Sequence, residues 1–190
     1  DQGNSVEGIQ AFLNRVQKAR QDANQREDLA MQEKVTKGEI SLDEQIDYNK
    51  RRQERFVPTS KEYQQLNNNT ADLQVAKKWE AYNLMDAQSI PRSQQLSFLR
   101  SWSSSLDQGS DLANQILQKE GTLQVKIARD EYSTELEKQK TEFDQGQIQR
   151  NQLISYLKSK LSNTTDEDLK AQVQADLDTQ QTALKQDADN

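Results

Sequence analysis

The fold of this chain is decided by a twelve-residue pattern that occurs three times: GEISLDEQIDYN at residues 38–49, QSIPRSQQLSFL at residues 88–99 and GQIQRNQLISYL at residues 146–157. When the copies are aligned on Ile40, Ile90 and Ile148, each has an aliphatic residue six positions later and an aromatic residue eight positions later. Their spacing along the chain is irregular. We therefore expect three diverged copies of one helical-hairpin unit.

The first residues of the pattern predict a turn between two helices. Gly38 and Gly146 fit the left-handed position just past a helix end, which glycine occupies without a steric penalty from a Cβ atom. Ser41 and Glu44 have the spacing of a capping box that would start the next helix. The second copy lacks the glycine and carries Pro91, which is tolerated in the first turn of a helix.

Each short helix is followed by a second stop and start. Thr59 with Glu62 and Thr164 with Glu167 have the spacing of capping boxes, and residues 103–111 are rich in Ser and Gly. The remaining segments predict four longer helices, giving seven helices in all. The longer helices are expected at residues 6–37, 61–87, 111–145 and 166–187.

The longer segments carry sparse apolar stripes. In the first, Ile9, Leu13 and Val16 recur at helical spacing, but no strict heptad is kept. Such stripes are seams of the coiled-coil kind, and Gly121 is expected to interrupt or kink the third one. The chain then divides into segments 1–60, 61–110 and 111–190, which are successive units of one extended design.

Composition indicates thin helices and little compact core. Hydrophobic residues make up 32% of the chain, compared with roughly 45–50% in an ordinary domain when Gly is counted. Charged residues make up 29%, yet the helix breakers are few, with 6 Gly and 2 Pro. We expect an all-α protein, either one elongated bundle or a coiled-coil-like array of long helices beside copies of themselves. The narrow seams favour an oligomer or a partner, and a monomeric helical bundle remains the alternative.

Charge and residue usage argue against several classes of function. The net charge of −6 is unfavourable for nucleic acid as the main partner, because binding phosphates needs a basic face. The best basic cluster, Lys50, Arg51, Arg52 and Arg55, is interpreted as a solvated helix face. No apolar run is long enough to span a membrane. Because the first residue is Asp, we expect a processed or trimmed chain, or an ordered fragment of a longer one.

Catalysis and cofactor binding are not expected. The chain has neither Cys nor His, so it lacks soft metal ligands and thiolate chemistry. The carboxylates of residues 166–168 are explained by the start of a helix, where the helix dipole favours acids. No catalytic, cofactor-binding or metal-binding residue is assigned.

Four aromatic residues, Trp79, Tyr82, Phe98 and Trp102, cluster around the second copy of the pattern. They form either part of the core or a contact site for another protein, because Trp and Tyr dominate such contacts. We expect Trp79 and Trp102 to be largely buried. The two functional hypotheses are a structural or assembly protein and a helical adaptor that binds a protein through these aromatics.

The segments from Gly38 to Ile40 and from Gly146 to Ile148, with the Gln-rich helices that flank them, resemble helical virion structural proteins of tailed bacteriophages. That group includes tail tape-measure, neck and internal proteins. The resemblance covers most of the chain in style, without a diagnostic motif. It implies a structural component of a virion that packs against its own copies or against other structural proteins, and it transfers no functional residue.

Overall fold

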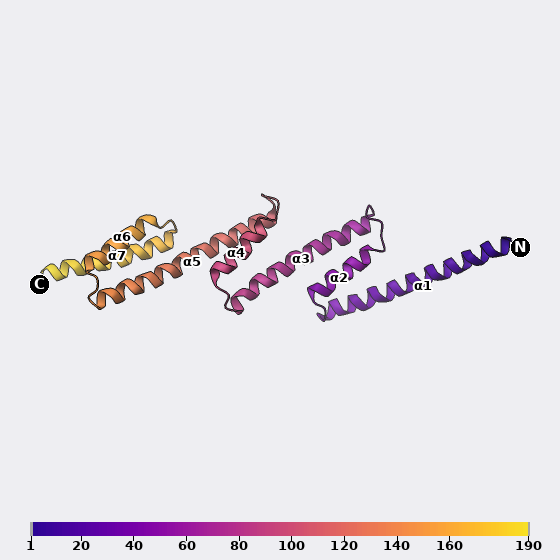
Figure 1. The fold of residues 1–190 in the computed structure, drawn as a ribbon, viewed down its shortest axis with the longest axis horizontal. Coiled ribbons are helices and arrows are strands. Elements are labelled where there is room, and N and C mark those ends of the chain that lie inside the picture. Colours follow the sequence, from indigo (N-terminus) through magenta and orange to yellow (C-terminus); the bar gives the residue numbers. More distant parts are fainter. Residues whose placement is uncertain (1, 190) are drawn as a thin grey trace. The chain divides into compact units, whose positions relative to one another are not determined.

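The computed structural model describes residues 2–189, which are all-α as predicted: 84% of them are helical and none lies in a strand. The seven helices, in chain order, are α1 Gln2–Lys37, α2 Leu42–Gln53, α3 Lys61–Ala87, α4 Arg92–Ser103, α5 Asp111–Asp144, α6 Arg150–Asn163 and α7 Glu167–Asp189. Long and short helices alternate as far as α6 (Figure 1). Within this part of the chain, no helix has the length and apolarity needed to cross a membrane.

The chain forms two compact units, residues 1–83 and residues 84–190, and α3 runs across the boundary. In the first unit, Ile46 and Tyr48 of α2 and Leu66 and Thr70 of α3 are buried. The second unit contains the largest apolar core. That core joins α5, α6 and α7 through Tyr132, Leu136, Leu153, Ile154, Leu157, Leu169, Val173 and Leu177. The division into segments 1–60, 61–110 and 111–190 stays a prediction.

The three long helices that precede a short one end in the same way. One or two positions after each helix, a residue has a left-handed φ: +68° at Gly38, +57° at Ser89 and +72° at Gly146. The next backbone N–H then bonds back to a carbonyl in the last helical turn, as in Glu39 N–H to Lys34 O at 2.9 Å. This is the Schellman arrangement, which satisfies carbonyls that a helix end leaves free.

The middle turn departs from the pattern by one residue. Gly38 and Gly146 lie two positions before their isoleucines, whereas Ser89 lies directly before Ile90. Ile90 N–H therefore makes the closing bond itself, to Met85 O at 2.9 Å. Pro91 follows as the N-cap of α4, so it precedes the helix rather than lying in its first turn.

The helix starts agree only partly with the predicted caps. Ser41 and Glu44 form a reciprocal capping box, with Glu44 N–H donating to Ser41 Oγ at 3.2 Å and Ser41 N–H donating to Glu44 Oε2 at 2.9 Å. At the start of α6, Gln149 N–H donates to Gln152 Oε1 at 2.7 Å. The isoleucine of each turn, Ile40, Ile90 and Ile148, is partly buried.

Two predicted capping boxes are wrong by one or two residues. Thr59 and Glu62 do not start α3, because Ser60 N–H closes a turn onto Val57 O at 2.8 Å and Ser60 itself caps the helix. Thr164 does not pair with Glu167, because its hydroxyl donates back to Lys160 O at 2.7 Å at the end of α6. Asp166 caps α7 instead, accepting from Leu169 N–H at 3.1 Å.

The expected break at Gly121 is also wrong, since α5 runs without interruption from Asp111 to Asp144. One glycine inside a helix costs only about 1 kcal/mol relative to alanine. Its neighbours Glu120 and Leu123 are buried against the preceding short helix, and that packing offsets the cost.

The left-handed position at residue 89 predicts a stabilising substitution. A non-glycine residue at such a φ is strained by roughly 1–2 kcal/mol. Glycine removes this strain, but part of the gain is lost because glycine raises the conformational entropy of the unfolded chain. We expect Ser89→Gly to raise the free energy of unfolding by about 0.5–1 kcal/mol in urea denaturation. The matched control is Gln88→Gly, one residue earlier at a negative φ, which should lower it instead. Equal effects of the two substitutions would contradict the assignment.

Candidate functional site

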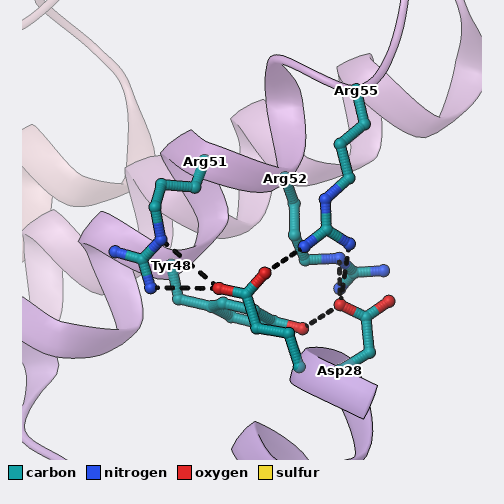
Figure 2. A network of polar contacts seen from close by, with 6 residues as sticks. Asp28, Tyr48, Arg51, Arg52 and Arg55 are labelled. Atoms are coloured by element: carbon teal, nitrogen blue, oxygen red, sulfur yellow. Dashed lines mark hydrogen bonds and ion pairs between the residues drawn. The ribbon is translucent and has the colours of Figure 1, made fainter. Parts of the chain in front are cut away.

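The densest polar contacts of the first unit join α1 to α2. Figure 2 shows this α1–α2 polar cluster, which consists of Glu27, Asp28, Tyr48, Arg51, Arg52 and Arg55. The acids lie on α1, and the basic residues lie on α2 and just beyond its end. Helical spacing places Tyr48, Arg51, Arg52 and Arg55 on one side of the short helix, so that a single face meets both carboxylates.

Asp28 is the centre of the cluster. Its Oδ1 accepts a short hydrogen bond from the Tyr48 hydroxyl and one from Arg55 Nη1 at 2.9 Å. Arg52 Nε lies 3.7 Å from the same oxygen. Burial works against ionisation of this carboxyl, but the bonds from Tyr48 and Arg55 and the charge of Arg52 outweigh it, so its pKa lies below the usual value. Asp28 is therefore a stably charged anchor and is not poised to exchange a proton near neutral pH.

Glu27 holds the outer arginines. Arg55 Nη2 donates to Glu27 Oε2, and Arg51 Nε and Nη2 lie 3.4 Å from Oε1. Three of the four residues in the basic cluster thus contact acids of α1 within the chain. Lys50 and Arg51 are exposed, as a solvated face implies, although Arg51 also contacts Glu27. The cluster is consequently occupied by internal ion pairs and does not present a free basic surface.

Tyr48 is almost fully buried beneath the arginines. The guanidinium of Arg52 lies over its ring, 5.6 Å from the centroid, a cation–π contact. Burial, the bond to Asp28 and that carboxylate's charge raise the pKa of Tyr48 to about 12. The hydroxyl stays protonated and acts as a structural donor.

A similar arrangement joins α5 to α6 in the second unit. Glu135 accepts from Tyr156 Oη at 3.0 Å and from Lys160 Nζ at 2.8 Å. The bonds from Lys160 and Tyr156 hold the pKa of Glu135 below its usual range, against the effect of burial. Tyr48 and Tyr156 both follow the isoleucine of their turn by eight residues, and Arg52 and Lys160 follow it by twelve.

Further polar contacts attach α5 to α7. The Tyr132 hydroxyl, fully buried, donates to Asp176 Oδ2 at 2.6 Å, and burial together with this bond raises its pKa. Arg129 donates to both carboxylate oxygens of Asp166, at 2.9 and 3.2 Å from Nη2. Asp166 thereby caps α7 and ties it to α5 at once.

The four aromatics predicted as a partner site form two pairs, one in each unit. Trp79 and Tyr82 lie edge to face at 6.0 Å between centroids, and Phe98 and Trp102 do so at 6.2 Å. Trp102 is buried, as expected, whereas Trp79 is only partly buried. Phe98 and Trp102 stand eight and twelve residues after Ile90, where the other two copies place a tyrosine and a base.

Taken together, these groups hold helices to one another. Both tyrosines of the clusters are locked as donors and the acids are paired with bases. No group of three Asp or Glu side chains among residues 2–189 converges in a way that could hold a metal ion. Sequence reasoning missed Glu27 and Asp28, although a tyrosine followed by a base on the facing short helix is a signal that could have indicated an acid on α1.

No protein-family model matches this chain, and no curated protein and no solved structure matches it either.

The α1–α2 polar cluster predicts a specific role for one hydroxyl. We expect Tyr48→Phe to lower the free energy of unfolding by about 1 kcal/mol, because it removes a bond to a charged, partly buried acceptor. Tyr63→Phe is the matched control in the same unit, since no hydrogen bond from its hydroxyl is seen among the described residues. Urea denaturation would compare both variants with the parent chain, and equal losses would contradict the role of Tyr48.

The raised pKa of Tyr48 predicts a loss of stability at alkaline pH. An ordinary tyrosine ionises near pH ~10, and Tyr48 in the folded chain ionises at about 12. Its contribution is therefore complete below about pH 10 and is lost as the pH rises through about 12. Between those values, the parent should lose roughly 1–2 kcal/mol more stability than Tyr48→Phe. Unfolding curves measured at several alkaline pH values would check this, and parallel curves for the two chains would refute it.

Proposed function

We propose that this chain is a non-enzymatic structural or assembly protein that packs its helices against other polypeptide chains. The observation that carries the proposal is the apolar face on the first half of α1. Val6, Ile9, Phe12 and Leu13 are exposed to 65%, 59%, 60% and 51%. None of residues 6–20 is buried, although they include several of the larger apolar side chains of a polar chain.

An exposed helix of this kind is expected to need a partner. In proteins, most of the stability of a helix comes from packing its apolar face against other elements. Contiguous apolar patches on a protein surface usually mark contact sites. The surface of α1 therefore supports association, either with copies of this chain or with neighbouring proteins.

We further propose a virion as the setting, with this chain as a component of a tailed bacteriophage particle. This rests on the style-level resemblance of the Gly-x-Ile turns and Gln-rich helices. The finer architecture belongs to the same proposal: three diverged repeats of one extended unit, arranged as a coiled-coil-like array. The shared left-handed turn residues and the two tyrosine–acid–base clusters support a repeated unit.

The alternative function is a helical adaptor. Because Trp102 is buried, such an adaptor would depend on Trp79, Tyr82 and Phe98, which are partly buried. Mass spectrometry of the native source separates the two functions by stoichiometry. Many copies in one particle indicate a scaffold, whereas one copy per partner indicates an adaptor.

The exposed face of α1 gives a direct test of the assembly function. We expect the full chain to associate with rising concentration in sedimentation velocity, or else to be monomeric with fast amide hydrogen exchange along residues 6–20. The double substitution Ile9→Glu with Leu13→Glu should abolish any association. The matched control, Ala11→Glu with Asn14→Glu, adds the same charge on the opposite face and should leave association unchanged. A monomer in which residues 6–20 are already protected from exchange would overturn the proposal.

A further inference from the structure

The spacing of the exposed α1 residues recurs on two other long helices. Val6, Ile9, Leu13 and Val16 are separated by three, four and three residues. The same separations occur on α3, at Tyr63, Leu66, Thr70 and Leu73, and on α5, at Ala113, Ile116, Glu120 and Leu123. The second and fourth positions are aliphatic in all three helices. We call this set of positions the receiving face.

On α5, the receiving face is covered by the short helix that precedes it. All four of its residues are buried, and Ile116 is completely inaccessible. The contacts of Glu120 show that α4 covers this face. Glu120 accepts a hydrogen bond from Ser103 Oγ at 2.9 Å and lies 3.8 Å from Arg100 Nε, and both residues are on α4.

On α3, the equivalent positions face α2. Leu66 and Thr70 are buried, and Leu73 lines one cleft together with Tyr48. The two helices run antiparallel, since Gln53 near the end of α2 contacts Asn67, whereas Asp43 near its start contacts Lys77.

On α1, the first three of these positions are exposed and Val16 is partly buried. Leu66 and Ile116 are 6% and 0% exposed, whereas the equivalent Ile9 is 59% exposed. α1 is long enough to pack against two short helices. It has 36 residues, close to the 34 of α5, which packs against one short helix near each end. On the second half of α1, Glu27 and Asp28 contact Arg51 and Tyr48 of α2. The first half has the length and pattern of a helix that would accept another hairpin.

The equivalence between α1 and α3 extends to a basic residue beyond the receiving face. Arg20 follows Val6 by fourteen residues, as Lys77 follows Tyr63. Lys77 forms an ion pair with Asp43, the second residue of α2. A short helix that covers α1 in the same way would therefore place its own first turn near Arg20, where a carboxylate would be favoured both by Arg20 and by the helix dipole.

We infer that the receiving face of α1 binds a helical hairpin of another protein. The short helix of that hairpin would run antiparallel to α1, with an apolar face of the α2 or α4 kind and an acidic residue in its first turn. This inference rests on the proposed assembly function and adds the form of the partner. A second copy of this chain fits less well, because each of its three short helices already lies against its own long helices.

The inference can be tested by supplying such a hairpin on the full chain. In the test protein, a second copy of residues 24–60 replaces residues 1–3, so that the added Ser60 precedes Val6 by the distance at which it precedes Tyr63. Tethering keeps the effective concentration high even for a weak contact. We expect amide hydrogen exchange along residues 6–20 to slow by at least tenfold. The matched control inserts Gln-Ala after the added Ser60, which rotates the receiving face by roughly 200° relative to the hairpin, and should show no slowing.

Cross-linking gives an independent measurement, since the chain has no cysteine. Arg20→Cys on α1 and Asp43→Cys in the added hairpin should react with a short bismaleimide as efficiently as Asp43→Cys with Lys77→Cys does in the unmodified chain. The inference is overturned if the test protein and the Gln-Ala control have equal exchange rates and equal cross-linking yields. A dimer of the unmodified chain that protects residues 6–20 equally well assigns the face to a second copy and overturns it too, while the assembly function survives. The assembly function fails separately, if the unmodified monomer already protects those residues.

Discussion

The constraint on which this structure depends is that a long helix with a narrow apolar stripe has to be covered near both ends. A chain with 32% hydrophobic residues cannot enclose its helices in one large core. It covers them locally, with short helices of 12 to 14 residues that fold back at a left-handed turn. In the second unit, α5 meets α4 along its first half and α6 along its second half. The exposed residues 6–13 of α1 do not meet this rule.

Polar contacts specify the register between helices, which the narrow apolar stripes cannot do alone. The tyrosine of α2 and the tyrosine of α6 each donate to a carboxylate of the preceding long helix, and a base lies against the same acid. Because a buried donor without a partner costs more than a satisfied one contributes, such bonds fix which residues may face each other. They therefore specify the register between a short helix and its long neighbour. In the middle copy, Phe98 and Trp102 occupy the corresponding positions, and aromatic packing replaces the polar contact.

The sequence predicted those features that depend on neighbouring residues. All-α character, the alternation of helix lengths, and the turns at Gly38 and Gly146 follow from propensity and spacing over a few positions. Ser89 was not predictable as the left-handed residue, because serine carries no such signature and the turn there is one residue shorter. Asp166 was missed as the cap of α7 because Thr164 has equally good spacing, and only the fold shows that its hydroxyl is already used by α6. The contacts of Glu27 and Asp28 span twenty or more residues, a range at which spacing carries little information.

The third position of the receiving face carries a different kind of side chain on each of the three helices. It is Thr70 on α3, Glu120 on α5 and Leu13 on α1. The buried hydroxyl of Thr70 donates to Leu66 O in its own helix, so it needs no hydrogen-bond partner on α2. The buried side chain of Glu120 lies against Ser103 and Arg100 of α4, so only a short helix with such donors could cover it without cost. Leu13 has the opposite requirement, because a polar or charged group placed against it would be desolvated without a partner. The short helix that covers α1 must therefore have apolar side chains where it meets Leu13, and polar ones only where it approaches Arg20.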